Sequence, residues 1–272
     1  MTRPKNPRLY FSFRSPYSWI ALRRLEAVLP DAAATVEYIP YWDADEQTSA
    51  ALAERGAEVL YQQMTKAKHL YLIQDTKRIA ARLGYQVRWP IDRDPWWELP
   101  HLGWLAARRA GVEREFYTAV TRARWEQGAD VCDRDVLRGV CVEAGLDAEP
   151  LLAAPDDPDI RAEGVEALSR AYDEDIFGIP YFLNGRRRFW GLDRLGDFID
   201  DLCQDGAKPS VPAPRAHGEP VQTVVDKSEP VLIGTVLTEP VQNQPEYTEP
   251  DQAEPALAGS APYDFDTAGG CG

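Results

Sequence analysis

Cysteine and histidine are scarce in this 272-residue sequence, which has four of the first and three of the second. The cysteines lie far apart, at Cys132, Cys141, Cys203 and Cys271, with neither the spacing of a metal site nor a Cys-x-x-Cys redox pair. We therefore predict no metal centre. Because these spacings suggest no disulfide framework, we expect reduced thiols, as in the cytoplasm.

Positive charge and long apolar runs are also missing. The net charge is −14, and residues 205–272 hold 11 acidic and 3 basic residues. Such a chain lacks the basic footprint of a nucleic-acid-binding protein and would be repelled by anionic lipid. No run approaches the ~18 apolar residues of a membrane span, and residues 1–7 lack the apolar core of a secretory signal. We expect a cytoplasmic protein with neither nucleic acid nor membrane as a partner.

The segment Ser15-Pro16-Tyr17-Ser18 is the most informative stretch that is present. It follows a strand-like run over 8–14 and begins a helix predicted over 16–29, with Pro16 in the first turn, where its missing N–H is not needed. Thioredoxin-fold proteins place a reactive Cys-x-x-Cys pair at such a junction, so the two serines exclude dithiol chemistry. Two interpretations of Ser15 remain. Its hydroxyl and the positive end of the helix stabilise the thiolate of a bound thiol, or Ser15 only caps the helix.

The remaining periodicity predicts a β-α-β unit, a helical block and a β-β-α unit. A strand is expected over 34–41, and amphipathic helices are expected over 48–62, 66–83, 97–110, 113–127, 133–144 and 159–173. Gly84, Gly111 and Gly145 are placed to end three of these helices. Strands over 181–183 and 188–190 surround the turn Asn184-Gly185, and a last helix covers about 192–202.

This order predicts an α/β protein, a thioredoxin fold with a large all-helical insertion. Residues 1–43 and 176–204 would form the fold, and residues 44–175 would form the insertion. Residues 205–272 differ, because a Glu-Pro pair recurs every ten residues, at Glu219, Glu229, Glu239 and Glu249. So acidic and proline-rich a segment cannot bury enough apolar surface to offset its ordering entropy, and we predict a disordered tail. Its repeat is either a remnant of duplication or a docking segment. Cys271 is either without special role, a modification site, or part of the end of a processed peptide.

Two further motifs lie near the end of the predicted fold. Pro180 precedes the hairpin, where a cis peptide bond would let the backbone of Ile179 pair with a peptide-like ligand; otherwise it is an ordinary proline at the start of a strand. Asp193 lies in the first turn of the last helix, where it either interacts with the helix dipole or receives the α-ammonium of a γ-glutamyl group. Gly191, followed by Leu192, would allow a ligand to approach closely.

The predicted insertion holds one charged group and one aromatic group. Along one helix lie Lys66, Lys68, His69, Tyr71, Asp75 and Arg78, which form either a solvated face or part of a site. Four tryptophans either form the core of the insertion or line an apolar substrate pocket: Trp89, Trp96, Trp97 and Trp104. His101 is the one histidine among them, and a structural role is favoured over a catalytic one.

These motifs resemble the DsbA-like thioredoxin superfamily, and within it the branch of 2-hydroxychromene-2-carboxylate isomerases and kappa-class glutathione transferases. The similarity runs in order through residues 10–18, 177–180 and 189–195 and covers about residues 8–203. It implies a homodimer that acts on aromatic ring-opening products. It also implies a glutathione site with Ser15 at the sulfur and, around the tripeptide, Pro16, Ser18, Ile179, Pro180, Gly191, Leu192 and Asp193.

The sequence departs from this resemblance in two places. The isomerases usually carry a Pro-x-Asn-Ser-like segment at the substrate region of the insertion, whereas residues 89–97 here contain no asparagine. Tyr181 follows Pro180 where a small residue such as threonine is frequent. The first departure argues against the standard chromene as substrate, and the second indicates a reshaped sulfur pocket.

We therefore predict an isomerase or glutathione-transferase-like enzyme that uses glutathione or another low-molecular-weight thiol on a small electrophilic substrate. Addition of the thiolate would turn a double bond into a single bond, rotation would follow, and elimination would return the thiol. The alternative is a redox-inactive binding or adaptor module whose tail recruits a protein partner or is itself a modified peptide.

Overall fold

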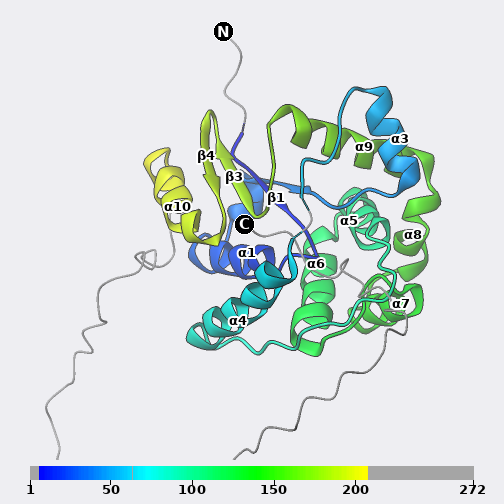
Figure 1. Ribbon diagram of the computed structural model, residues 1–272, viewed down its shortest axis with the longest axis horizontal. Helices are drawn as coiled ribbons and strands as arrows, with labels where there is room; N and C mark the ends of the chain where they lie inside the picture. Colours follow the sequence, from blue (N-terminus) through cyan, green and yellow to red (C-terminus); the bar gives the residue numbers. More distant parts are fainter. Residues whose placement is uncertain (1–5, 63, 208–272) are drawn as a thin grey trace, which may run out of the picture. The chain divides into compact units, whose positions relative to one another are not determined.

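The computed structural model describes residues 6–62 and 64–207 of the chain (Figure 1). Its centre is a four-stranded sheet in the order β2-β1-β3-β4, made of β1 (Arg8–Phe11), β2 (Glu37–Pro40), β3 (Tyr181–Asn184) and β4 (Arg187–Trp190). β1 runs parallel to β2 and antiparallel to β3, and β3 forms an antiparallel hairpin with β4. Strands that are far apart in the sequence thus meet in one thioredoxin-like sheet, which confirms the predicted fold class.

β1 and the helix α1 (Pro16–Val28) form the junction predicted around Ser15. Every residue of β1 is buried, but the strand ends at Phe11 and not at residue 14 as predicted. The backbone turns there, because Ser15 N donates to Ser12 O at 3.2 Å and Ser12 N donates to Ser18 Oγ at 3.3 Å. Pro16 is the first residue of α1, as predicted.

The outer strands and the last helix follow the prediction with local differences. The strand predicted over 34–41 begins only at Glu37, because a run of three alanines favours a short helix, α2 (Ala32–Thr35). The hairpin is confirmed, with Gly185 in its turn at φ +61°, although Asn184 belongs to β3. The last helix begins as a 3₁₀ turn, η3 (Leu192–Arg194), and continues as α10 (Leu195–Gln204).

Between β2 and β3 the chain is helical, as predicted. Its elements are α3 (Glu46–Glu54), α4 (Lys66–Arg82), α5 (Glu98–Ala110), α6 (Glu113–Arg122), η1 (Ala123–Gln127), α7 (Arg134–Glu143), α8 (Ala148–Leu152), η2 (Ala154–Asp156) and α9 (Pro158–Asp173). The glycines predicted to end helices, Gly84, Gly111 and Gly145, follow α4, α5 and α7 with φ between +71° and +72°.

Three parts of the insertion differ from the prediction. The helix predicted over 48–62 starts earlier, because Asp45 caps it by accepting from Thr48 N, and it ends just before Gly56, where φ is +70°. The helix predicted over 113–127 changes at residue 123 into a π turn, η1, in which two successive large side chains, Arg124 and Trp125, are both buried. α8 and η2 are absent from the prediction, because such short helices show no periodicity.

The insertion and the sheet share one hydrophobic core. Phe11 contacts Trp104 and Tyr117 with ring centroids 5.2 Å apart, and Phe13 contacts Tyr117 at 5.5 Å. α1 packs beside α10 and α4, and α9 packs against β2 (Figure 1). Aromatic contacts therefore attach the inserted helices α5 and α6 to the segment that carries Ser15.

The tail was predicted over residues 205–272, and all of it from residue 208 on, with the Glu-Pro repeat and Cys271, lies outside the described residues. Within residues 6–62 and 64–207, no helix has the length and apolar character needed to cross a membrane. In the same ranges, no group of three or more His, Cys, Asp or Glu side chains is arranged to hold a metal ion.

Candidate functional site

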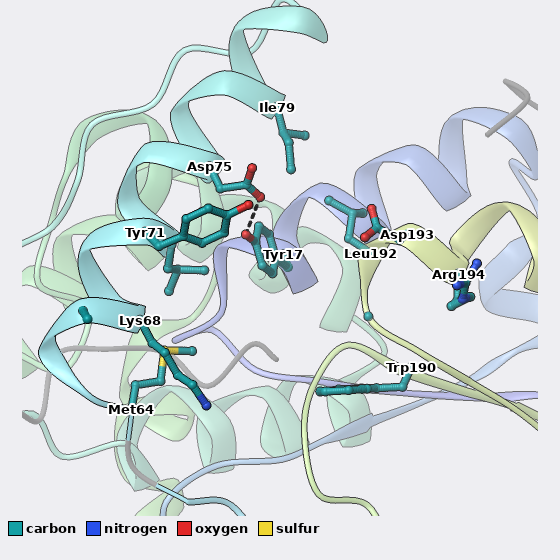
Figure 2. A pocket seen from close by; sticks show the side chains of 13 residues that line it. Tyr17, Met64, Lys68, Tyr71, Asp75, Ile79, Trp190, Leu192, Asp193 and Arg194 are labelled. Carbon is teal, nitrogen blue, oxygen red and sulfur yellow. Dashed lines mark hydrogen bonds between the residues drawn. The ribbon is translucent and has the colours of Figure 1, made fainter. Parts of the chain in front are cut away.

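A pocket of about 790 Å³ lies between α4, the start of α1 and the segment that joins β4 to α10 (Figure 2). Its volume is in the range typical of small-ligand sites, ~300–1,000 Å³. Figure 2 shows Tyr71 and Asp75 on the α4 side and Leu192 and Asp193 on the side of η3. The lining residues are Tyr17, Met64, Ala67, Lys68, Tyr71, Leu72, Asp75, Ile79, Trp190, Gly191, Leu192, Asp193 and Arg194.

Ser15 is the N-cap of α1, two residues before the pocket-lining Tyr17. Its Oγ accepts from Ser18 N at 3.1 Å, and its side chain is fully buried. Ser15 therefore caps α1. The cap leaves room for a role toward a thiolate, which stays a prediction, because a serine hydroxyl can accept one hydrogen bond and donate another. Pro16 and Ser18 are buried too, and neither they nor Ser15 line the pocket.

Tyr17 and Asp75 link α1 to α4 at the pocket wall (Figure 2). Tyr17 Oη donates to Asp75 Oδ2 at 2.6 Å, and Arg78 Nη2 donates to Asp75 Oδ1 at 2.8 Å. The first distance is typical of a hydroxyl that donates to an ionised carboxylate. This pair fixes the position of α4, and with it the side of the pocket that Lys68 and Tyr71 line.

The polar residues singled out on α4 therefore divide into two sets. Lys68, Tyr71 and Asp75 line the pocket, which favours the interpretation of a site for these three. Lys66 and Arg78 do not line it and are exposed. His69 points elsewhere, with its ring centroid 5.9 Å from that of Trp89.

Gly191 and η3 place Asp193 at the opposite wall. Gly191 has φ +86°, a conformation that favours glycine, and its N–H donates to Pro180 O at 2.9 Å. The chain therefore turns after β4, and Leu192, Asp193 and Arg194 line the pocket. Asp193 lies in the first turn as predicted, although that turn is 3₁₀.

The peptide bond between Ile179 and Pro180 is cis, as predicted, and the alternative of an ordinary trans proline is wrong. Both residues are buried and neither lines the pocket. They contact the site through the hydrogen bond from Gly191 to Pro180. Pairing of the Ile179 backbone with a ligand stays a prediction.

His101 lies in the interior and has a structural role. Its Nε2 accepts from Phe13 N at 3.2 Å, so Nδ1 carries the proton and donates to Trp97 O at 2.7 Å. Ser12 Oγ lies 3.0 Å from Nε2 and donates the second bond. Burial lowers the pKa of His101 to about 3, and Arg124 and Arg14 add to that shift. The neutral ring holds the turn between β1 and α1 in place.

Two buried acids complete this interior network. Glu98 accepts from Trp42 Nε1 and, at 3.0 Å, from Asp45 N, and burial raises its pKa to about 7. Asp92 pairs with Arg124 through two hydrogen bonds of 2.6 and 2.8 Å, and both side chains are 1% exposed. These charges lie outside the pocket and stabilise the packing of the insertion.

The four tryptophans belong mainly to the core. Trp97 and Trp104 are buried, and Trp89 and Trp96 pack against the same core. None of them lines the large pocket, although Trp104 lines a separate cavity of about 220 Å³. The interpretation of these residues as a substrate wall is therefore wrong for the large pocket.

Sequence reasoning missed seven residues of the pocket wall: Tyr17, Met64, Ala67, Leu72, Ile79, Trp190 and Arg194. Three of them, Tyr17, Trp190 and Arg194, lie inside motifs that the sequence had marked, next to predicted site residues. The Trp190 ring can occupy its position because residue 178 is a glycine: a Cβ added at Gly178 would lie 2.6 Å from Trp190 Nε1. The missing signal was the position of α4, which decides which neighbours of the motifs face a pocket.

Comparison with known proteins agrees with this architecture. Residues 8–202 match the family of DsbA-like thioredoxin domains. The chain is 30% identical to a 2-hydroxychromene-2-carboxylate isomerase from Sphingobium xenophagum over 200 residues, which are 72% of this chain and 96% of that protein. It is 22% identical to the uncharacterised protein YwbO of Bacillus subtilis, over 65% of this chain and 86% of that one.

Solved structures show the same fold. A 2-hydroxychromene-2-carboxylate isomerase superposes with a TM-score of 0.57 at 22% identity, covering 74% of this chain and 97% of the other. A probable DsbA oxidoreductase from Streptomyces coelicolor gives a TM-score of 0.53 at 22% identity, over 73% and 88% of the two chains.

Proposed function

Since the chain belongs to the DsbA-like thioredoxin family, we propose that it is a thiol-dependent isomerase, with a glutathione-transferase-like reaction as the closest variant of the same chemistry. The named relative that shares 30% of its residues is an isomerase. The observation that carries the proposal is the pocket beside the start of α1, which Tyr17 lines. The neighbouring Ser15 and Ser18, both buried, occupy the positions where a redox protein of this fold would hold its cysteines. A bound thiol would supply the nucleophile that the chain lacks there.

The pocket has groups that fit the charges of a γ-glutamyl tripeptide. Such a ligand carries one ammonium and two carboxylates, and it needs acceptors and cations at separate points. Asp193 and Asp75 offer carboxylates, and Lys68 and Arg194 offer cations, all on the pocket wall. The volume of about 790 Å³ leaves room for a small second substrate.

Ser15 and α1 would hold the sulfur as a thiolate. The N-terminus of a helix of 13 residues carries a partial positive charge of roughly half an elementary charge. A hydrogen bond from a hydroxyl to a charged group contributes about 1.5–3 kcal/mol. Both effects favour the ionised sulfur at the point where an electrophilic carbon would approach it.

The substrate is a small electrophilic molecule, and 2-hydroxychromene-2-carboxylate is the first compound to test because the named relative acts on it. We expect absorbance changes on its conversion only when glutathione or another small thiol is present. If the purified chain converts it at the same rate without any thiol, the proposed role of the pocket is wrong.

The binding step is tested separately by calorimetric titration with glutathione. We expect Asp193→Ala to weaken binding about tenfold or more, since it removes the carboxylate that would receive the ammonium.

The role of Ser15 is tested by turnover. Ser15→Ala should lower turnover about ten- to a hundredfold, which corresponds to the loss of one charge-assisted hydrogen bond. Asp133→Ala is the matched control, because it removes the N-cap of α7 without touching the pocket. Equal losses of turnover in Ser15→Ala and Asp133→Ala would mean that Ser15 acts only as a helix cap and takes no part in the reaction.

A further inference from the structure

A second cavity, of about 220 Å³, lies where the inserted helices α5 and α6 meet α1, α2 and β2. The described residues that line it are all different from those that line the pocket beside α4. An engineered apolar cavity of about 150 Å³ in another protein binds benzene. A cavity of about 220 Å³ therefore has room for one aromatic ring with a substituent.

Aromatic side chains fix the shape of this cavity. Trp104 and Tyr117 both line it, and each of their ring centroids lies 5.2 Å from that of Phe11. Val36 lines it too, and Val36 and Trp104 are both 2% exposed. Because these walls belong to the packed core, they are formed before a ligand arrives, and little binding free energy is lost in ordering them.

Glu26, on α1, places a weakly bonded carboxylate at the cavity. Its Oε1 accepts from Tyr38 Oη at 3.4 Å, and its Oε2 accepts from Arg114 Nη2 at 3.4 Å. Both distances exceed the ~2.5–2.9 Å of a strong hydrogen bond to a carboxylate. The Arg114 side chain is 56% exposed, so solvent also screens that ion pair. A ligand hydroxyl can therefore donate a shorter hydrogen bond to Glu26 than either of these partners does.

The hydroxyl of Tyr117 is a second polar group of the cavity wall. Its oxygen is buried and has no hydrogen-bond partner within residues 6–62 and 64–207. Burial raises the pKa of Tyr117, and Glu26 and Tyr38 add to the shift, so the hydroxyl is neutral and lies near two other lining residues. A buried hydroxyl without a partner destabilises the fold, and an oxygen acceptor on a ligand would relieve that cost.

The charges around the cavity balance one another. Arg108 pairs with Glu163, and Glu37 accepts two hydrogen bonds from Arg170, at 2.7 and 2.9 Å. Glu113 lies in the first turn of α6, where the positive end of the helix dipole offsets its charge. A neutral ligand suits this rim better than an ion of either sign.

We propose that this cavity is a second small-molecule site, and that it binds a phenol, a neutral one-ring aromatic alcohol. The ring packs against Trp104 and Val36. The phenol hydroxyl donates to Glu26, and its oxygen accepts from Tyr117. The proposal goes beyond the thiol chemistry proposed above and does not depend on it, because the two sites have different walls.

The test is a titration of the full chain with 4-fluorophenol, followed by the width of the fluorine NMR line. Fluorobenzene, which lacks only the hydroxyl, should bind at least about fivefold more weakly, since it cannot donate to Glu26. Absence of saturable binding of 4-fluorophenol, or equal binding of the two compounds, would overturn the proposal.

A matched pair of variants locates the site. Ala33 and Ala34 are both exposed on α2, but only Ala33 lines the cavity. Ala33→Phe should fill the cavity and weaken binding of 4-fluorophenol at least about tenfold, whereas Ala34→Phe should leave it unchanged. Asp193→Ala, which alters the large pocket, should also leave it unchanged. Full binding to Ala33→Phe, or its loss in Asp193→Ala, would place the phenol elsewhere and overturn the proposal.

Tyr117→Phe separates the hydroxyl from the ring. Because the hydroxyl has no partner within the described ranges, its removal should leave the urea midpoint of unfolding unchanged or higher. Binding of 4-fluorophenol should nevertheless weaken about three- to tenfold. Unchanged affinity would overturn the contact assigned to Tyr117, and a lower midpoint would show that the hydroxyl is bonded within the fold and contradict its assignment to a ligand.

Discussion

The pocket beside α4 and the interior of the insertion both collect ionisable side chains, but they use them in opposite ways. In the interior, Glu98, His101 and Arg124 are almost fully buried, and each is fixed by partners on neighbouring segments. In the pocket, Lys68, Asp193 and Arg194 are exposed and stand around open space.

This difference shows that a strongly shifted pKa does not locate the site in this protein. The pKa of His101 is lowered to about 3 and that of Glu98 is raised to about 7, both by burial. Yet neither side chain lines the pocket. Perturbed groups are candidates for catalysis only when a ligand can reach them, and here the accessible groups are the ones on the pocket wall.

The largest expected effect comes from breaking the interior ion pair. Arg124→Ala leaves Asp92 as a buried charge without its partner. It also removes the packing of the Arg124 guanidinium over the Trp97 ring, whose centroid lies 4.7 Å away. We expect a loss of about 3–5 kcal/mol in the free energy of unfolding, the usual result of removing one partner of a buried pair. Urea unfolding followed by fluorescence measures it.

Arg194→Ala is the control from the pocket side. Its guanidinium is exposed, so the free energy of unfolding should change by less than about 0.5 kcal/mol. Comparable losses in both variants would mean that the two regions do not differ as the structure indicates.

The next effect concerns pH. The pKa of His101 is lower in the folded chain than in the unfolded one, so the unfolded state binds more protons between pH 6.5 and about 3. Its contribution to stability is therefore lost as the pH falls through that range. The pKa of Glu98 is raised, so its contribution has the opposite sign and stability falls as the pH rises from about 4.5 to about 7. The two contributions oppose each other between about pH 4.5 and 6.5.

His101→Gln should reveal this opposition. Between pH 6 and 4.5 the wild type should lose about 2 kcal/mol more than the variant, since only the wild type has to protonate the imidazole on unfolding. Urea unfolding at several pH values gives both curves. Parallel curves would show that His101 is protonated in the folded chain, against the hydrogen bond from Phe13 to its Nε2.

The sequence was sufficient for the fold because its strongest signals are local. The run before Ser15, the proline at the first helical position and the Asn184-Gly185 signal all act over a few residues. The proline lies where it was expected, the strand ends three residues early, and the turn lies one residue late, at 185–186. The errors occur where a second local preference competes, as in the alanine run of α2, or where tertiary burial changes the helix, as at Arg124 in η1.

The site was less predictable because it depends on distance in space. Gly191, Leu192 and Asp193 were expected in a ligand site and do line the pocket. Tyr17 was not expected, because only its bond to Asp75, 58 residues away, makes it part of the wall. No periodicity in the sequence reports which face of α4 meets α1.

Tyr17→Phe sharpens the comparison at the pocket. It removes the 2.6 Å hydrogen bond to Asp75 and leaves the ring in place. We expect a loss of about 1 kcal/mol in the free energy of unfolding, together with several-fold weaker glutathione binding, because α4 loses its link to α1. Calorimetry and urea unfolding on one preparation give both values. A loss of stability with unchanged glutathione binding would mean that Tyr17 supports the fold, as the interior residues do, and does not contribute to the pocket.

The smallest effect lies outside both regions and has the opposite sign. Gly139 is an exposed residue inside α7, and a Cβ added there would meet no atom within 4 Å. Gly139→Ala should raise the free energy of unfolding by about 0.5–1 kcal/mol, because alanine loses less backbone entropy in a helix. Thermal unfolding and glutathione titration should show a more stable chain with unchanged affinity. A change in glutathione affinity in this variant would mean that α7 is coupled to the pocket, which would contradict the proposed independence of the interior and the site.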